Sequence, residues 1–272
     1  MKFAFIKTIL SLLFIFFVVA SFFSCSDHDI EAVPTAGLTK ISEGYALGAA
    51  AKVEVWAAAE LFAGYNQLYF ALYDSLTSQA ITDSHIHIHP EMEMQMMSHS
   101  CPVEEPESEA VKKLFPAAIL FTMPSGDMGS WKLETKIHNH VNGLFGTVSF
   151  DINVKSANPP QVISFQASSG ERFYLAYRFP EKQKVGINDF EVIAFTSTDG
   201  KFLPAENLTM TLTPEMPSMD HGSPNNEDPA HVGQGHYKGK ANFTMTGEWR
   251  LQLELTTESG VLENKYFDIV VE

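Results

Sequence analysis

The chain repeats itself at a fixed spacing of 122 residues, and this constrains its fold more than any other feature. The segments HPEMEMQMMSHSCP and TPEMPSMDHGSP are alike, and further pairs share the same offset. They are Gly64 with Gly186, Asn66 with Asn188, Met97 with Met219, His99 with His221, Pro102 with Pro224, and Phe121-Thr122-Met123 with Phe243-Thr244-Met245. Trp131 matches Trp249 after a four-residue insertion. The spacing predicts two copies of one domain, at residues 43–157 and 158–272, joined by a short, stiff SANPPQ segment.

Each predicted copy has the pattern of short strands. The segments RFYLAYRF, DFEVIAFTS, NLTMTLTP, KANFTMTG, WRLQLELTT and KYFDIVVE alternate or run apolar, and Gly, Asn, Asp or Pro interrupt them. The alanine-rich AAAKVEVWAAAELFAG is predicted to be strand from its place in the repeat, and SEAVKKLF one or two helical turns. We therefore expect an all-β protein, with two tandem Ig-like antiparallel β-sandwich domains after a lipoprotein signal peptide.

The N-terminus predicts export. Lys2 and Lys7 precede the apolar run ILSLLFIFFVVASFF, and Ser24 and Cys25 follow it. This resembles a bacterial lipoprotein signal, which predicts cleavage after residue 24, a lipid on Cys25 and a tether at residues 25–42. The alternative is a signal that anchors the chain without being cleaved. The acidic SDHDIE segment then favours anchoring to the outer membrane, on its periplasmic or cell-surface face.

Charge and motifs exclude several classes of function. The formal net charge is −15, and loss of residues 1–24 with Lys2 and Lys7 makes it −17, so nucleic acid is not an expected partner. An acidic chain attracts cations. The sequence contains no Gly-x-Ser-x-Gly, no His-Glu-x-x-His and no glycine-rich phosphate loop, so we do not expect an enzyme.

The second copy carries a set of motifs in a fixed order. They are Gly186-x-Asn188, Met216-x-x-Met219-x-His221-Gly222, Gly235-x-Tyr237, and Phe243-x-Met245-x-Gly247-x-Trp249. Together they resemble the YtkA-like domain family, which is related to FixH-type domains. The resemblance implies a small extracytoplasmic Ig-like sandwich of a kind often found with copper-handling genes. The first copy looks like a degenerate member, because it lacks the glycine after its histidine and the Gly-x-Tyr piece.

Soft donor side chains gather in both copies. Thioether and thiolate groups select Cu(I), and imidazole suits copper, zinc and nickel. The predicted metal ligands of the second copy are Met216, Met219, His221 and Met245, and those of the first are Met94, Met97, His99, Cys101 and Met123. Asp220 could orient His221. The alternative is that these methionines only fill gaps in the packing.

The first copy adds histidines at period two. In SHIHIHP, His85, His87 and His89 lie on one face of a predicted strand, and the isoleucines between them face the core. Neighbouring histidines could share a Cu(II) or Zn(II) ion. The alternative is a solvated strand that happens to use histidine. His138 and His140, in KIHNHVNG, are predicted to be surface residues of a hairpin turn.

These patterns favour an envelope lipoprotein that binds copper, mainly Cu(I), as a chaperone, buffer or resistance factor. Its expected partners are the metal ion, the membrane through its lipid, and envelope copper-handling proteins. One alternative is a non-metal interaction or spacer module built from tandem sandwiches. Another is a zinc or nickel scavenger that uses only His85, His87 and His89.

Overall fold

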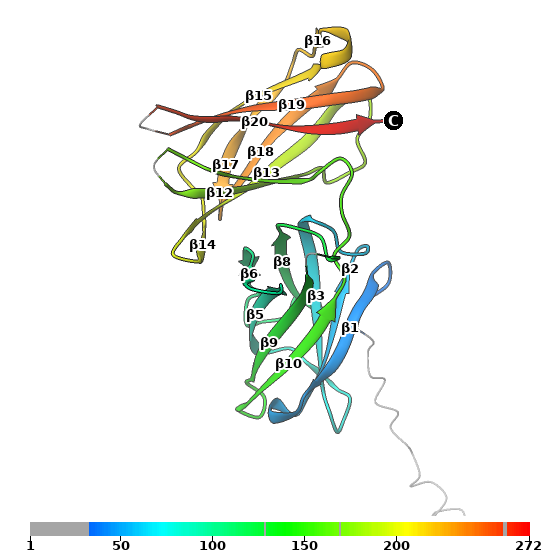
Figure 1. Ribbon diagram of the computed structural model, residues 1–272. Coiled ribbons are helices and arrows are strands. Elements are labelled where there is room, and N and C mark those ends of the chain that lie inside the picture. Colours follow the sequence, from blue (N-terminus) through cyan, green and yellow to red (C-terminus); the bar gives the residue numbers. More distant parts are fainter. Residues whose placement is uncertain (1–32, 128, 169, 258–259) are drawn as a thin grey trace, which may run out of the picture. The chain divides into compact units, whose positions relative to one another are not determined.

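Four antiparallel sheets account for nearly all of the regular structure in the described residues (Figure 1). The computed structural model describes residues 33–127, 129–168, 170–257 and 260–272. The only helical segments within these ranges are two short 3-10 turns, η2 (Leu47–Ala49) and η3 (Pro217–Met219). No helix of the described residues is long and apolar enough to cross a membrane.

Two of the sheets belong to the first half of the chain. The larger has the order β1 (Thr39–Ala46), β2 (Ala51–Ala57), β3 (Gly64–Asp74), β8 (Phe115–Phe121), β7 (Val103–Glu104), with β4 (Ala80–Ile81) paired to β3. The smaller has the order β10 (Leu144–Ile152), β9 (Ser130–Asn139), β5 (Ser84–Glu93), β6 (Ser98–Ser100). Their buried side chains form one hydrophobic core.

The second half repeats this arrangement. Its larger sheet has the order β11 (Val162–Gln166), β12 (Arg172–Arg178), β13 (Gly186–Thr198), β18 (His236–Phe243), β17 (Glu227–Gly233), with β14 (Lys201–Pro204) paired to β13. Its smaller sheet has the order β16 (His221–Gly222), β15 (Thr209–Met216), β19 (Gly247–Thr257), β20 (Gly260–Val271). Strand for strand, this is the order of the first half, and the predicted all-β antiparallel fold is confirmed.

Equivalent asparagines make the same local contacts in both halves. The Asn66 amide donates to Phe62 O and Gly64 O and accepts from Phe62 N. The Asn188 amide likewise donates to Lys184 O and Gly186 O and accepts from Lys184 N. In both halves an Asn side chain therefore pairs the backbone groups of the loop that enters the third strand, which explains why these asparagines recur.

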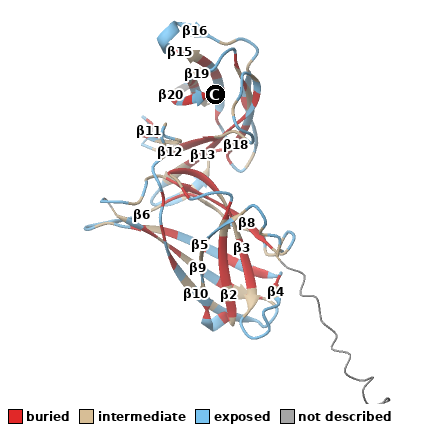
Figure 2. Cartoon of the chain, turned by 90° about the vertical axis from the view of Figure 1, so that its right-hand side faces the viewer, coloured by how far each residue is buried: buried red, intermediate tan, exposed pale blue. Residues whose placement is uncertain are grey.

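Alternation along the strands separates core from surface, as the colours of Figure 2 show along β5 and β9. In β5, Ile86 and Ile88 are buried, and the histidines on either side of them are exposed, as expected. Trp131 and Trp249 are the largest fully buried side chains of the two cores. Burying a ring of this size contributes strongly to each core.

The structure differs from the sequence-based expectations at two places, and a third expectation lies outside the described residues. Strand β1 begins at Thr39, so residues 39–42 belong to a sheet and not to the tether. SEAVKKLF is not helical: Lys112 and Lys113 have left-handed φ angles of 52° and 65°, and Val111 and Leu114 close a tight turn. The predicted signal peptide and Cys25 lie outside the described residues.

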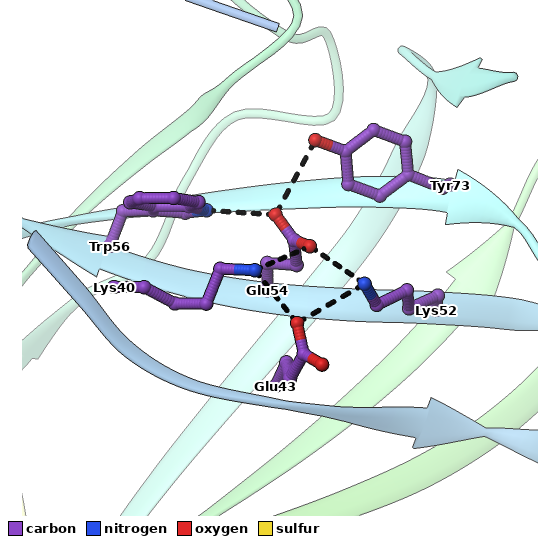
Figure 3. Close-up of polar contacts among 6 residues, drawn as sticks. All are labelled: Lys40, Glu43, Lys52, Glu54, Trp56 and Tyr73. Carbon is purple, nitrogen blue, oxygen red and sulfur yellow. Dashed lines mark hydrogen bonds and ion pairs between the residues drawn. The ribbon is translucent and has the colours of Figure 1, made fainter. Parts of the chain in front are cut away.

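A buried carboxylate ties the first three strands together on the outer face of their sheet (Figure 3). Glu54 on β2 accepts from Lys40 on β1 at 2.9 Å and from Lys52 at 2.8 Å. The Trp56 indole N–H and the hydroxyl of Tyr73 on β3 donate to its other oxygen. Burial alone would raise the pKa of Glu54, but the hydrogen bonds from Lys52 and Lys40 outweigh it and lower that pKa.

Replacing Glu54 by Gln should lower the free energy of unfolding at neutral pH by about 1.5–3 kcal/mol, the usual contribution of hydrogen bonds to a charged group. Because the folded-state pKa is lowered, this contribution is present above the carboxyl pKa of the unfolded chain and is lost as the pH falls through the folded-state value. Denaturant titrations of wild type and variant should therefore converge in acid. The control Glu43→Gln removes a half-exposed carboxylate and should cost much less; equal losses would contradict this account.

Candidate metal centre

Three histidines come together at one end of the smaller sheet of the first half. In the antiparallel register of β5 and β9, His85 lies directly opposite His138. His140 follows the last residue of β9, and its backbone N–H donates to Asp83 O at 3.3 Å. One ligand atom from each of the three histidines lies within 4.8 Å of the other two. The backbone register therefore makes a three-imidazole cluster, which we call the histidine triad.

A carboxylate extends the histidine triad. His140 Nδ1 lies 2.5 Å from Asp83 Oδ1, and His140 Nε2 lies 2.8 Å from His85 Nδ1. The ring of His138 stacks on Phe145 with centroids 3.9 Å apart. Asp83 can only accept when ionised, so it holds the Nδ1 proton of His140 and leaves Nε2 with a free lone pair.

The turns beside the histidine triad are fixed by buried groups. Asn139 is buried; its amide donates to Ala49 O at 3.1 Å and accepts from Val141 N at 3.0 Å. On the other strand, Ser84 is buried, and its hydroxyl donates to His138 O at 2.8 Å. Positions on both sides of the cluster are therefore held by backbone contacts.

The predicted grouping of His85, His87 and His89 is replaced by a different one. The three do share the exposed face of β5. However, His87 Nδ1 contacts the Glu105 carboxylate, while His85 turns to the two histidines of β9 and its turn. His89 lies opposite Glu134 on β9. Among the described histidine, cysteine and acidic residues, one group of three has ligand atoms close enough to hold an ion, and of the three predicted ligands only His85 belongs to it.

Three of the four predicted soft ligands of the second half, Met216, His221 and Met245, lie at or beside the turn between β18 and β19. Met216 ends β15 opposite His221 on β16, and its side chain is buried. A Cβ on Gly247 would meet Met216 Cε at 2.9 Å, so this glycine makes room for the thioether. Met219 and Met245 are 52% and 38% exposed, so neither is a core residue.

A tryptophan forms the base of this group. His221 Nε2 lies 3.0 Å from Thr244 Oγ1, and the His221 ring meets the Trp249 ring at 61° with centroids 6.3 Å apart. The Trp249 indole N–H donates to Met245 O at 3.0 Å. The group therefore offers an imidazole, thioethers and an aromatic ring around one turn. The partner of His221 is Thr244, not Asp220 as its position in the sequence suggested.

The first half repeats part of this group. The Trp131 indole N–H donates to Met123 O at 3.0 Å, as Trp249 does to Met245 O. His99 pairs with Met92 across β5 and β6, so Met92 takes the place of Met216. Met97 is 58% exposed in the loop between these strands, while Met94 and Met123 pack against the core.

Cys101 is poorly placed to bind a metal. Its side chain is 2% exposed and lies inside the hydrophobic core of the first half. Burial raises the pKa of its thiol well above the usual value, so the thiolate that a metal needs is disfavoured. The burial of Cys101 argues against the prediction that it is a ligand, and its place at the end of the methionine-rich loop did not reveal that it points inward.

His138 and His140 are the candidate ligands that the sequence pattern, which predicts surface residues of a hairpin turn, does not reveal, and Asp83 carries no sequence signal. The missing information was the register between β5 and β9, which places His138 opposite His85. The period-two spacing of His138 and His140, the same as that of His85 and His87, was the available signal.

One segment of the chain matches a known protein family. Residues 174–254 match the model of the YtkA-like family, so this part of the second half is similar to YtkA-like domains. The predicted resemblance is thereby confirmed for the second half, while membership of the first half stays a prediction. No curated protein matches the chain.

Several solved structures are similar at low scores. The adhesin InvE of Yersinia pseudotuberculosis is 14% identical with a TM-score of 0.25, over 88% of this chain and 59% of InvE. A conserved domain protein from Bacillus anthracis is 12% identical with a TM-score of 0.34, over 89% of this chain and 93% of its own. Domains 5–6 of the S-layer protein SbsC are 9% identical with a TM-score of 0.28, over 86% and 98%. At such scores these similarities carry no functional argument.

The position of Cys101 gives a direct chemical test. The thiol should react with iodoacetamide at least about 100-fold more slowly in the native chain than in the guanidinium-unfolded chain, because reaction requires local opening. Mass spectrometry of the peptide that contains Cys101 measures the two rates. Labelling at similar rates in both states would contradict the buried position.

Proposed function

We propose that this protein is an exported copper-binding protein that holds Cu(I) at Met219, His221 and Met245, with Met216 beneath them. The observation that carries the proposal is the convergence of His221 on Thr244 and Trp249, at the turn that also bears Met245. Its role is to bind and pass on metal as a chaperone, buffer or resistance factor, and not to catalyse a reaction.

The donor set fits Cu(I). Thioether sulfur is a soft ligand that selects Cu(I), and imidazole completes such sites. The exposed thioethers of Met219 and Met245 are accessible to an incoming ion, whereas Met216 approaches from the core side. A site of this kind would offer little to a hard ion such as Mg²⁺, which demands oxygen ligands.

Partial repetition of the site supports the proposal. The hydrogen bond from the tryptophan N–H to the methionine carbonyl occurs in both halves, at Met123 and Met245. We propose Met94, Met97, His99 and Met123 as a second, more open soft site. Cys101 is excluded from it by its burial.

The cellular setting of the proposal comes from the N-terminal sequence. A lipid on Cys25 would attach the chain to the outer membrane, with its sandwiches on the periplasmic or cell-surface face. Its expected partners are then envelope proteins that deliver or accept copper. The acidic character of the chain favours the approach of cations. The rival function, a spacer or interaction module, predicts no metal dependence.

Cu(I) binding tests the proposal. The full-length protein, kept reduced in detergent, is titrated against a Cu(I) chelator together with the variant Met219→Leu/His221→Ala/Met245→Leu. Losing these ligands should weaken Cu(I) binding by at least about tenfold, or about 1.4 kcal/mol. Met96→Leu is the matched control, because Met96 is 94% exposed and outside the predicted site; it should change nothing. If wild type and the triple variant retain equal Cu(I), the proposed Cu(I) site at Met219, His221 and Met245 is wrong.

A further inference from the structure

We infer that His85, His138 and His140 form a second metal site of different chemistry, for one divalent first-row transition-metal ion such as Zn(II) or Cu(II). The inference rests on the geometry of the histidine triad and does not depend on the Cu(I) proposal. It also differs from the predicted sharing of an ion among His85, His87 and His89.

The distances suit one ion. Three imidazole nitrogens at 2.0–2.1 Å from a tetrahedral ion lie roughly 3.3–3.4 Å from each other. Ligand atoms of the histidine triad already lie within 4.8 Å of one another, and His85 Nδ1 and His140 Nε2 are 2.8 Å apart. Rotation of the exposed His85 ring, with small adjustments of the half-buried His138 and His140 rings, would bring all three to bonding distance.

The protonation states also suit a metal. Asp83 accepts a hydrogen bond from Nδ1–H of His140, and in this tautomer the Nε2 lone pair is directed toward His85. Without a metal, His85 Nδ1–H donates to that lone pair. An ion would replace this hydrogen bond, and His85 would give up its Nδ1 proton or bind through Nε2. A carboxylate behind a ligating histidine is the usual outer partner in such sites, where it fixes the ring and strengthens the ligand.

The surroundings keep the site in place. The cross-strand register holds His85 opposite His138, and the stack on Phe145 limits rotation of the His138 ring. Buried Asn139 anchors the turn that carries His140. Asp83 is held on both sides, by Ser84 N to Ser108 O at 2.9 Å and Ala110 N to Thr82 O at 2.9 Å. Because these residues are already held in place, metal binding costs less conformational entropy.

The lining of the site selects the kind of ion. The groove beside the histidine triad is lined by His85, His138, Lys136 and Phe145 among others, and none of its lining residues carries sulfur. Imidazole without thioether or thiolate favours borderline divalent ions over Cu(I). The one cation in the groove, Lys136, is paired with Glu134 at 3.3 Å. Three protein ligands leave one coordination position open to water or to an exogenous ligand.

Zn(II) and Cu(II) titrations test the inference on the full-length protein in detergent. Isothermal titration against a competing chelator should give one ion per chain held by the histidine triad. His138→Ala and His140→Ala should each weaken binding at least about tenfold. Asp83→Asn should weaken it by about 10–100-fold, as loss of an outer-shell carboxylate does. Bound Cu(II) should show nitrogen splitting in its electron paramagnetic resonance spectrum, and this splitting should be reduced in His138→Ala.

Matched controls separate this site from others. His89→Ala removes an exposed histidine of the same strand that lies opposite Glu134 and outside the groove, and should leave Zn(II) affinity within about twofold of wild type. Met219→Leu/His221→Ala/Met245→Leu should also leave it unchanged, while His138→Ala should leave Cu(I) retention unchanged. Thermal melting of the metal-free variants verifies that they fold. If wild type and a folded His138→Ala/His140→Ala variant bind Zn(II) and Cu(II) equally, the inference is overturned.

Discussion

The smaller sheet of each half buries one face in a hydrophobic core, and the rest of the structure depends on this constraint. In β5 and β9 it places Ile86, Ile88 and Ile137 in the core, so every second side chain faces water. A slip of one residue would bury the histidines and expose the isoleucines, which fixes the register. His85 therefore lies opposite His138 because the core requires it. The apolar face of the sheet determines which polar groups meet on the other.

Sequence alone could predict the duplication and the fold, because both follow from local patterns. The 122-residue spacing pairs Asn66 with Asn188, and each makes the same backbone contacts. Departures from the repeat have physical reasons as well. The Tyr237 hydroxyl donates to Ala205 O and accepts from Leu208 N, whereas the equivalent position in the first half is Phe115, which can do neither.

The candidate sites were less accessible to sequence analysis, because they depend on which strands pair. His85 and His140 are 55 residues apart in the chain, and no local pattern joins them. The direction in which a single side chain points also decides whether it can join a site. Cys101 follows an exposed methionine-rich loop but points into the core. His221 contacts Thr244, which lies in the turn between β18 and β19, and not its sequence neighbour Asp220. Composition predicted soft donors, while register and burial decide which of them can act together.

The two halves thus present donor sets of different softness: thioethers and an imidazole beside Trp249, and three imidazoles backed by Asp83. By ligand chemistry the first suits Cu(I) and the second suits a divalent ion. Both proposals require that the protein carries transition metal in its native setting. Elemental analysis of the protein, extracted from its native envelope without chelators, tests this most directly. We expect copper, alone or with zinc, at about one ion or more per chain. Protein that contains neither metal above the level of a variant lacking both donor sets would contradict the account.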